Sequence, residues 1–230
     1  MIFEKLKKVQ SRIRAAAEKA GRNPNKVELL AVTKYASLED TRALIRAGVR
    51  QFGENRVQNA LQRRDALGAE GKGLTWRFIG HLQTNKVKQA LTMFQAFDAV
   101  DSKKLAQALE SNLAAQNKTA PILIQVKLTD RESQSGVTPA DLPALLESIR
   151  TFKNVRAAGL MAIAPIKEDP EETRPYFAAM KKLFDEHFSE PFRTGEGPYL
   201  SMGMSQDFEI AVEEGANLVR IGSALFAQTL

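Results

Sequence analysis

Short apolar runs alternate with amphipathic stretches along almost the whole chain of 230 residues. The clearest run, Leu29 to Thr33, has consecutive apolar or β-branched residues, as expected of a strand that is buried on both faces. Further strands are predicted at 49–55, 74–80, 96–100, 121–126, 155–161, 199–201 and 218–221. These segments are short, as strands of a parallel sheet usually are.

Between the strands, apolar residues recur at helical spacing. Helices are predicted at 3–20, 38–47, 57–66, 86–93 and 103–116, from 138, from a start between 169 and 175 to 187, at 208–214 and from 222. Ser37 and Ser102 are expected to cap two of them, and a Gly/Pro-rich loop is expected at 189–198.

Strands that alternate with helices indicate a parallel sheet. Eight such units in a chain of this length predict one (β/α)₈ TIM barrel, an α/β domain over 1–230 with an extra N-terminal helix. An open, doubly wound sheet is the alternative. No Gly-rich dinucleotide-binding motif follows the first strand, which counts against it.

Composition excludes several kinds of site. The chain has no cysteine, which excludes disulfides and thiolate chemistry, and only His81 and His187 could supply imidazoles to a metal. No apolar run approaches the roughly 18 residues that cross a membrane. The charged N-terminus lacks the apolar core of a secretion signal, so a cytoplasmic protein without a membrane partner is expected.

The net charge is +6, which raises the question of a nucleic-acid partner. The basic residues occur as scattered pairs, Lys7-Lys8, Arg63-Arg64, Lys103-Lys104 and Lys181-Lys182. Acidic residues lie near most pairs, so we interpret them as solvated helix faces and expect no nucleic-acid binding. A modest positive field would instead favour small anionic ligands.

Lys34 follows the first predicted strand directly, with the apolar strand beneath it. Burial there would disfavour the ammonium form, and a neutral amine can form a Schiff base with an aldehyde. The alternative is a lysine that simply extends into water.

In such barrels the functional site lies at the carboxyl ends of the strands, and phosphate is often bound after strands 7 and 8. Ser201-Met202-Gly203-Met204-Ser205-Gln206-Asp207 and Arg220-Ile221-Gly222-Ser223-Ala224 occupy these two places. Their glycines, hydroxyls and helix N-termini suit a phosphate group, although capping serines and tight turns would give the same pattern. Together with Lys34, they indicate a phosphorylated aldehyde as ligand.

Several segments resemble one protein family. They are Ala31-Val32-Thr33-Lys34, Phe52-Gly53-Glu54-Asn55, the stretch 78–86, Gly159-Leu160-Met161, the stretch 201–207 and Val219-Arg220-Ile221-Gly222-Ser223. The chain resembles the pyridoxal-phosphate-binding homeostasis proteins, which are similar to the barrel domain of alanine racemase. The resemblance implies a fold-type III barrel that holds pyridoxal 5′-phosphate (PLP) as an aldimine on Lys34. The chain departs from the family pattern at Arg56, Lys127 and Gln134.

The resemblance also implies roles around the phosphate. Ser205, Gly222 and Ser223 are expected to hold it, with Ser201 and Gly203 nearby.

Arg220 resembles the arginine that faces the pyridine nitrogen in alanine racemase. A lasting cation there disfavours protonation of the ring and weakens it as an electron sink. The alternative is an ion pair between Arg220 and an acid such as Glu213.

The remaining expected site residues surround the cofactor ring. Asn55 is expected to bond the ring oxygen and Met161 to line the pocket. His81 and Asn85 are placed at the rim, with polar anchoring of their loop as the alternative.

Racemisation needs an acid or base on each face of the substrate carbon. Alanine racemase supplies the second group as a tyrosine through another domain and a dimer partner, and this chain ends directly after the barrel. Tyr35 is expected on the far side of its strand, Tyr176 in a helix and Tyr199 at a strand start. The prediction is therefore a monomeric PLP carrier without turnover. As the resemblance implies, it would buffer the cofactor or pass it to apo-enzymes, and so affect vitamin B6 and amino-acid balance.

Two enzymatic alternatives remain. One is a small PLP-dependent racemase or lyase. The other is an aldolase that uses Lys34 on a phosphorylated sugar.

Overall fold

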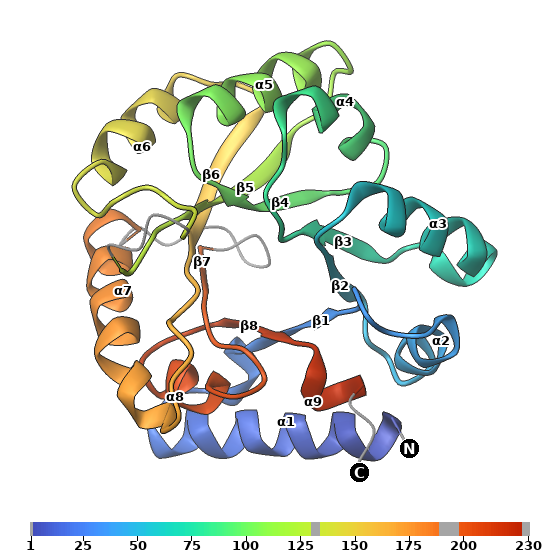
Figure 1. The fold of residues 1–230 in the computed structure, drawn as a ribbon, viewed down its shortest axis with the longest axis vertical. Helices are drawn as coiled ribbons and strands as arrows, with labels where there is room; N and C mark the ends of the chain where they lie inside the picture. The colour runs from blue at the N-terminus through green and yellow to red at the C-terminus, as the bar shows by residue number, and fades with distance from the viewer. Residues whose placement is uncertain (1, 130–133, 189–197, 227–230) are drawn as a thin grey trace.

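The fold is a closed barrel of eight parallel strands, seen in a computed structural model that describes residues 2–129, 134–188 and 198–226 (Figure 1). Each strand pairs with the next, and β8 closes the ring against β1. The strands are β1 (Glu28–Val32), β2 (Gln51–Glu54), β3 (Thr75–Phe78), β4 (Ala96–Val100), β5 (Ala120–Gln125), β6 (Val155–Met161), β7 (Tyr199–Ser201) and β8 (Leu218–Ile221). The TIM-barrel prediction is confirmed, and the open-sheet alternative is wrong.

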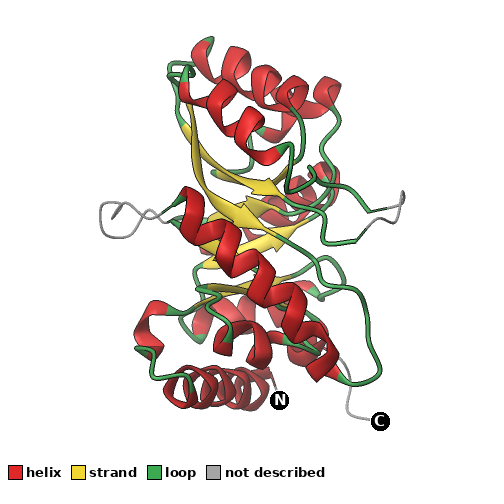
Figure 2. Cartoon of the chain, turned by 90° about the vertical axis from the view of Figure 1, so that its left-hand side faces the viewer, coloured by secondary structure: helices red, strands yellow, loops and turns green. Residues whose placement is uncertain are grey.

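Helices surround the strands on the outside of the barrel (Figures 1 and 2). They are α1 (Ile2–Lys19), α2 (Leu38–Arg46), α3 (Val57–Leu67), α4 (Val87–Ala90), α5 (Lys103–Ala114), α6 (Leu142–Arg150), α7 (Arg174–His187), α8 (Phe208–Glu213) and α9 (Ser223–Phe226). Short 3₁₀ turns, η1 (Pro24–Lys26), η2 (Gly68–Gly71), η3 (Thr84–Lys86) and η4 (Pro170–Thr173), complete the connections. No helix among the described residues has the length and apolar character needed to cross a membrane.

The helix α1 is the extra N-terminal helix that the sequence predicts. Its buried residues include Leu6, Val9 and Ile13, which recur at helical spacing, and it packs against α8, α9 and α2. Arg12 adds a double hydrogen bond from its guanidinium to the carboxylate of Glu209 on α8. The helix therefore covers the part of the barrel where α8 and α9 are short.

Two helices are shorter than predicted. The helix expected from 138 begins at Leu142, because Pro143 lacks the amide hydrogen that would extend it backwards. The hydroxyl of Thr138 still accepts a hydrogen bond from the amide of Asp141 at 3.1 Å. The helix expected at 86–93 is split into η3 and α4, and its last residues tighten into turns such as Met93 N to Ala90 O. The loop predicted at 189–198 lies outside the described residues, all of it except Pro198.

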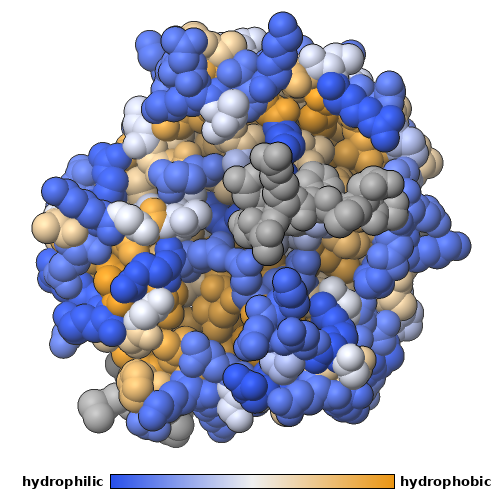
Figure 3. All heavy atoms as spheres, turned by 180° about the vertical axis from the view of Figure 1, so that it is seen from behind, coloured by the Kyte–Doolittle hydropathy of each residue, from blue (hydrophilic) through white to orange (hydrophobic). Residues whose placement is uncertain are grey.

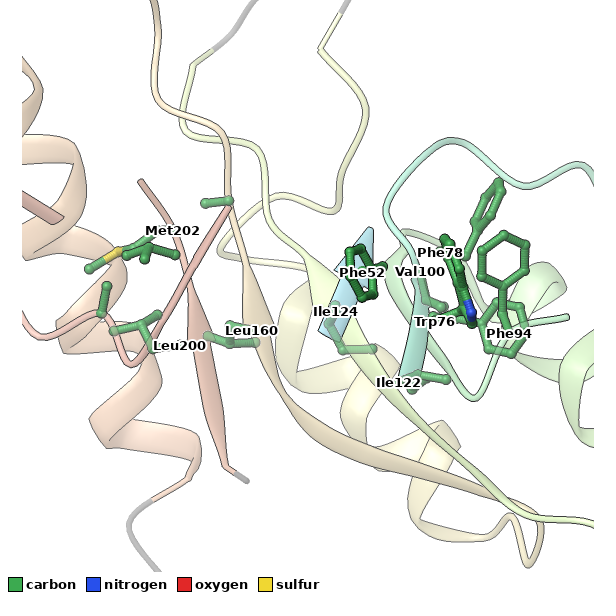
Figure 4. Close-up of a cluster of buried hydrophobic side chains, with 14 of the residues drawn as sticks. Phe52, Trp76, Phe78, Phe94, Val100, Ile122, Ile124, Leu160, Leu200 and Met202 are labelled. Carbon is green, nitrogen blue, oxygen red and sulfur yellow. The ribbon is translucent and has the colours of Figure 1, made fainter. Parts of the chain in front are cut away.

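Buried side chains form two hydrophobic layers. The outer layer lies between strands and helices and includes close aromatic pairs, such as Phe52 with Trp76 at 5.3 Å and Phe78 with Phe94 at 5.0 Å between ring centroids (Figure 4). The inner cluster fills the barrel itself and is built from Leu30, Ala99, Leu123, Ala158, Met161, Tyr199 and Leu218. On the surface turned away in Figure 1, hydrophilic side chains predominate and hydrophobic ones lie in the gaps between them (Figure 3).

Candidate functional site

A cavity of about 820 Å³ lies where the strands end at their carboxyl sides. Residues that follow β1, β2, β3, β5, β6, β7 and β8 line it, so it occupies the place where this fold carries its sites. Its lining includes Lys34, Tyr35, Asn55, Ile79, His81, Gln134, Ile163, Ile166, Lys167, Ser205, Asp207, Arg220, Gly222 and Ser223.

Lys34 and Tyr35 lie together on the wall of this cavity. Both are exposed, and the Lys34 Nζ lies 5.1 Å from the centroid of the Tyr35 ring. The expected burial of the lysine is therefore not found, although the buried Val32 forms part of the wall below it. The placement expected for Tyr35 is wrong, because β1 ends at Val32 and the alternation of a strand no longer applies in the turn that follows.

One arginine organises the loop that carries Lys34. Arg63 on α3 donates from Nη2 to the backbone oxygens of Thr33 and Ala36, at 2.9 and 3.0 Å, and from Nη1 to Ser37 O at 3.3 Å. Its side chain is only 13% exposed. The prediction of a solvated helix face is thus wrong for Arg63. In the sequence, Arg63-Arg64 looks like the other basic pairs, so nothing there marked Arg63 as a structural residue.

A buried carboxylate completes this loop. Glu54 ends β2, and its Oε1 accepts hydrogen bonds from Thr33 Oγ1 at 2.6 Å and from Arg63 Nε at 3.1 Å. Burial raises the pKa of Glu54, while the bond from Thr33 and the charges of Arg63 and Lys34 oppose the rise. Its Oε2 is buried without a hydrogen-bond partner among the described residues.

The predicted phosphate site is only partly assembled from the expected residues. Ser205, Gly222 and Ser223 line the cavity, and Ser205 Oγ accepts hydrogen bonds from the amides of Gly222 at 3.3 Å and Ala224 at 3.1 Å. Two amides at the start of α9 are therefore bonded to a serine hydroxyl, and this serine lines the cavity.

Ser201 and Gly203 support this wall from behind. Ser201 is buried and bonds Arg220 rather than lining the cavity. Gly203 has φ +87°, and a Cβ there would come within 2.9 Å of the Phe208 Cα, so glycine is required for the turn into α8. Neither residue is among those that line the cavity, and their place beside the phosphate stays a prediction.

Arg220 is a buried cation at the floor of the cavity. It donates from Nη1 to the backbone and hydroxyl oxygens of Ser201 and from Nη2 to Ala162 O, each at 2.8 Å. Burial lowers the pKa of Arg220 to about 10, against the opposing charges of Asp98 and Asp207. The alternative of an ion pair with Glu213 is wrong, because Glu213 pairs with Lys19 and Arg174.

The other expected site residues divide into two groups. Asn55 and His81 line the cavity, and His81 is exposed with its Nδ1 3.7 Å from Asp101 Oδ2. Met161 is buried in the inner cluster of the barrel, and the exposed Asn85 lies in η3, so neither lines the cavity. Met161 is the last residue of β6, and the residues that line the cavity follow shortly after it. The sequence alone does not show at which residue the barrel interior ends and the cavity begins.

Sequence reasoning also missed part of the lining. Ile163 and Ile166 follow β6 and are exposed at the cavity, while Asp207 is buried within it. An apolar pair in a proline-containing loop after a barrel strand is the signal that could have identified the isoleucines. No group of three or more His, Cys, Asp or Glu residues placed to hold a metal occurs in the described part of the chain.

The sequence matches the family model "Alanine racemase, N-terminal domain" over residues 5–229. Pyridoxal phosphate homeostasis proteins are similar over nearly their full length. Those of Aquifex aeolicus (strain VF5) and Pseudomonas aeruginosa are 40% identical over 225 residues, which is 98% of this chain and 97% and 94% of theirs.

Solved structures agree with these matches. PipY of Synechococcus elongatus PCC7942, solved with PLP bound, superposes with a TM-score of 0.84 at 34% identity, over 99% of this chain and 100% of that one. Alanine racemase from Clostridium difficile 630 shares the fold, with a TM-score of 0.70 at 12% identity over 95% of this chain and 56% of that one. The resemblance found in the sequence is confirmed.

Proposed function

Because the chain belongs to the pyridoxal phosphate homeostasis protein family, we propose that it binds PLP covalently through Lys34 and carries it without catalytic turnover. The observation that carries the proposal is the placement of Lys34, Ser205, Ser223 and Arg220 on one cavity. In this proposal the protein is a cytoplasmic monomer that buffers PLP or passes it to apo-enzymes.

The cavity has groups that suit the aldehyde, the phosphate and the ring nitrogen of PLP. Lys34 offers an accessible amine for the aldehyde. Ser205 and Ser223 line the cavity near the start of α9 and offer hydroxyl donors for the phosphate. Arg220 offers a cation without a carboxylate hydrogen-bonded to it among the described residues, as a basic ring nitrogen requires.

PLP, when bound, supplies an electron sink that stabilises carbanions next to an amino group. Arg220 limits that chemistry, because a cation that faces the ring nitrogen disfavours its protonation. Lys34 can hold or move a proton on one side of the cofactor. The side chains of the chain are therefore better arranged for holding the cofactor than for turning over a substrate.

Tyr35 favours a second candidate function, a weak PLP-dependent racemase or lyase. It is the tyrosine that lines the cavity among the described residues, whereas Tyr176 and Tyr199 do not. However, its ring adjoins Lys34, and racemisation needs its two proton-transfer groups on opposite faces of the substrate carbon.

The first experiment is the visible absorption spectrum of the purified protein, followed by borohydride reduction and mass mapping of the modified peptide. We expect a yellow protein with the cofactor mass on Lys34, and neither feature in Lys34→Ala. Because Lys34 is exposed, that variant should fold as the wild type does. A wild-type protein that takes up no added PLP would overturn the proposal, and trapping only with a sugar phosphate would favour the aldolase.

Solvent-deuterium exchange at the α-carbon of a broad amino-acid panel separates carrier from enzyme. The carrier shows no exchange above that of free PLP. Exchange that disappears in Lys34→Ala and falls in Tyr35→Phe would establish the second candidate instead.

A further inference from the structure

We propose that Glu54 and Arg63 are positioning residues for Lys34: together they fix the loop that carries this lysine. The inference rests on the proposed function only in that Lys34 is the residue that binds the cofactor. It assigns a role to two residues that lie outside the cavity wall.

Arg63 holds the loop on both sides of Lys34. Its Nη2 bonds the carbonyl of Thr33 just before the lysine and that of Ala36 two residues after it. Its Nη1 bonds Thr41 Oγ1 at 2.9 Å in the first turn of α2. A planar guanidinium with donors fixed in a fork suits such a task, which a flexible ammonium cannot reproduce.

Glu54 connects the same loop to the neighbouring strand. Its carboxylate holds both Thr33 and Arg63, and the next residue, Asn55, lines the cavity. The pair therefore ties the Lys34 loop to the strand end that carries Asn55. Glu54 is fully buried, yet its Oε2 has no hydrogen-bond partner among the described residues.

The test uses the full-length protein without added PLP and a readout that does not need the cofactor. Backbone hydrogen exchange of the peptide that contains Lys34 is followed by mass spectrometry. We expect exchange there to be roughly 3- to 10-fold faster in Arg63→Met and in Arg63→Lys, because both lose the fork that bonds the carbonyls of Thr33 and Ala36. Glu54→Gln, which weakens the link between this loop and β2, should speed exchange about 2- to 3-fold.

A second readout is the rate at which PLP leaves the loaded protein during dialysis against an aldehyde trap. Arg63→Met and Arg63→Lys should both release it roughly 3- to 10-fold faster, because both lose the fork that fixes the loop. Thr33→Val keeps the backbone contacts and removes only the hydroxyl bond to Glu54. It serves as the milder variant if Arg63→Met does not fold, and we expect it to release PLP up to about 3-fold faster.

Arg42→Met is the matched control. Arg42 on α2 also bonds a glutamate and a backbone carbonyl, Glu70 Oε1 at 2.8 Å and Ala66 O at 2.9 Å, but it does not contact the Lys34 loop. It should change neither readout. Equal effects of Arg42→Met and Arg63→Met, or wild-type behaviour of both Glu54→Gln and Arg63→Met, would overturn the inference. Absence of any PLP adduct in the wild type would overturn the proposed function and leave the hydrogen-exchange result intact.

Discussion

Arg77 and Arg220 are both buried in the barrel, but the partners of the two guanidinium groups differ in charge. Arg77 makes a double hydrogen bond to the carboxylate of Asp98, at 2.7 and 2.8 Å, and lies 4.8 Å from the centroid of the Tyr199 ring. Although burial opposes its charge, Asp98 outweighs that effect and raises the pKa of Arg77 above its ordinary value.

Arg220 has only neutral acceptors within hydrogen-bond distance among the described residues, and burial lowers its pKa to about 10. Arg77 thus has its counter-charge in direct contact, whereas the carboxylates of Asp98 and Asp207 act on Arg220 without a hydrogen bond to it. The difference teaches that a buried arginine stabilises the fold when a carboxylate is bonded directly to it. A buried arginine whose hydrogen-bond acceptors are all neutral can still attract an anionic or basic group of a ligand.

The largest effect on stability is expected for Arg77→Met. It leaves the Asp98 carboxylate buried without its partner, which should lower the free energy of unfolding by about 3–5 kcal/mol. Urea denaturation of the protein without PLP measures this. The double variant Arg77→Met with Asp98→Leu, which removes both charges, should recover most of the loss. A single variant within 1 kcal/mol of the wild type would break the comparison.

Arg220→Met should cost less, about 1–3 kcal/mol, because no ionised group loses its hydrogen-bonded partner. Its main effect should appear in the loaded protein, as a changed visible spectrum of bound PLP. The same denaturation experiment and an absorption spectrum test both statements. A loss as large as that of Arg77→Met would show that the two arginines do not differ as described.

The double variant Ser205→Ala with Ser223→Ala tests the other polar wall of the cavity. Loss of the Ser205 bonds to the amides of Gly222 and Ala224 should cost about 1 kcal/mol of stability. Retention of PLP should weaken about tenfold, because phosphate loses hydroxyl donors, while circular dichroism stays unchanged. Ser148→Ala, on the outer helix α6, is the matched control. Unchanged retention would refute the phosphate site at these loops.

The smallest effect concerns pH and Asp207. Burial raises the pKa of Asp207 above 3.8, although the Met204 amide and the charge of Arg220 oppose the rise. The folded protein therefore keeps this proton to higher pH than the unfolded chain, and the wild type loses stability as the pH rises through that interval. Asp207→Asn lacks the titration, so the wild type should lose stability relative to it as the pH rises above the ordinary pKa of an aspartate. A difference that is constant or grows in the other direction would contradict this sign.

The local part of the fold was accessible from the sequence, because its signals lie within a few residues. Ser37 and Ser102 cap helices as predicted, with bonds from the amides of Asp40 at 3.0 Å and Leu105 at 3.3 Å. Where prolines or tight turns compete with helical hydrogen bonds, as at Pro143, the predicted boundaries moved.

Residues of the site could be predicted from the sequence only where they directly follow a strand, in the loops where this fold carries its sites. Lys34, Asn55, Ser205 and Ser223 reach the cavity for that reason. Met161 does not, because its side chain faces the inner cluster one step below. Ser201 and Gly203 support the wall, which depends on the packing of α8 behind it.

What the sequence by itself determined is the order of elements, the barrel they form and the lysine at the end of the first strand, since periodicity and capping are local properties. Only the tertiary structure decided which charges are compensated. Arg63 meets Thr33 across 30 positions of the chain, and Arg220 meets Ala162 across 58. Whether a buried charge finds a counter-charge depends on such distant contacts, and closure of the barrel brings them together.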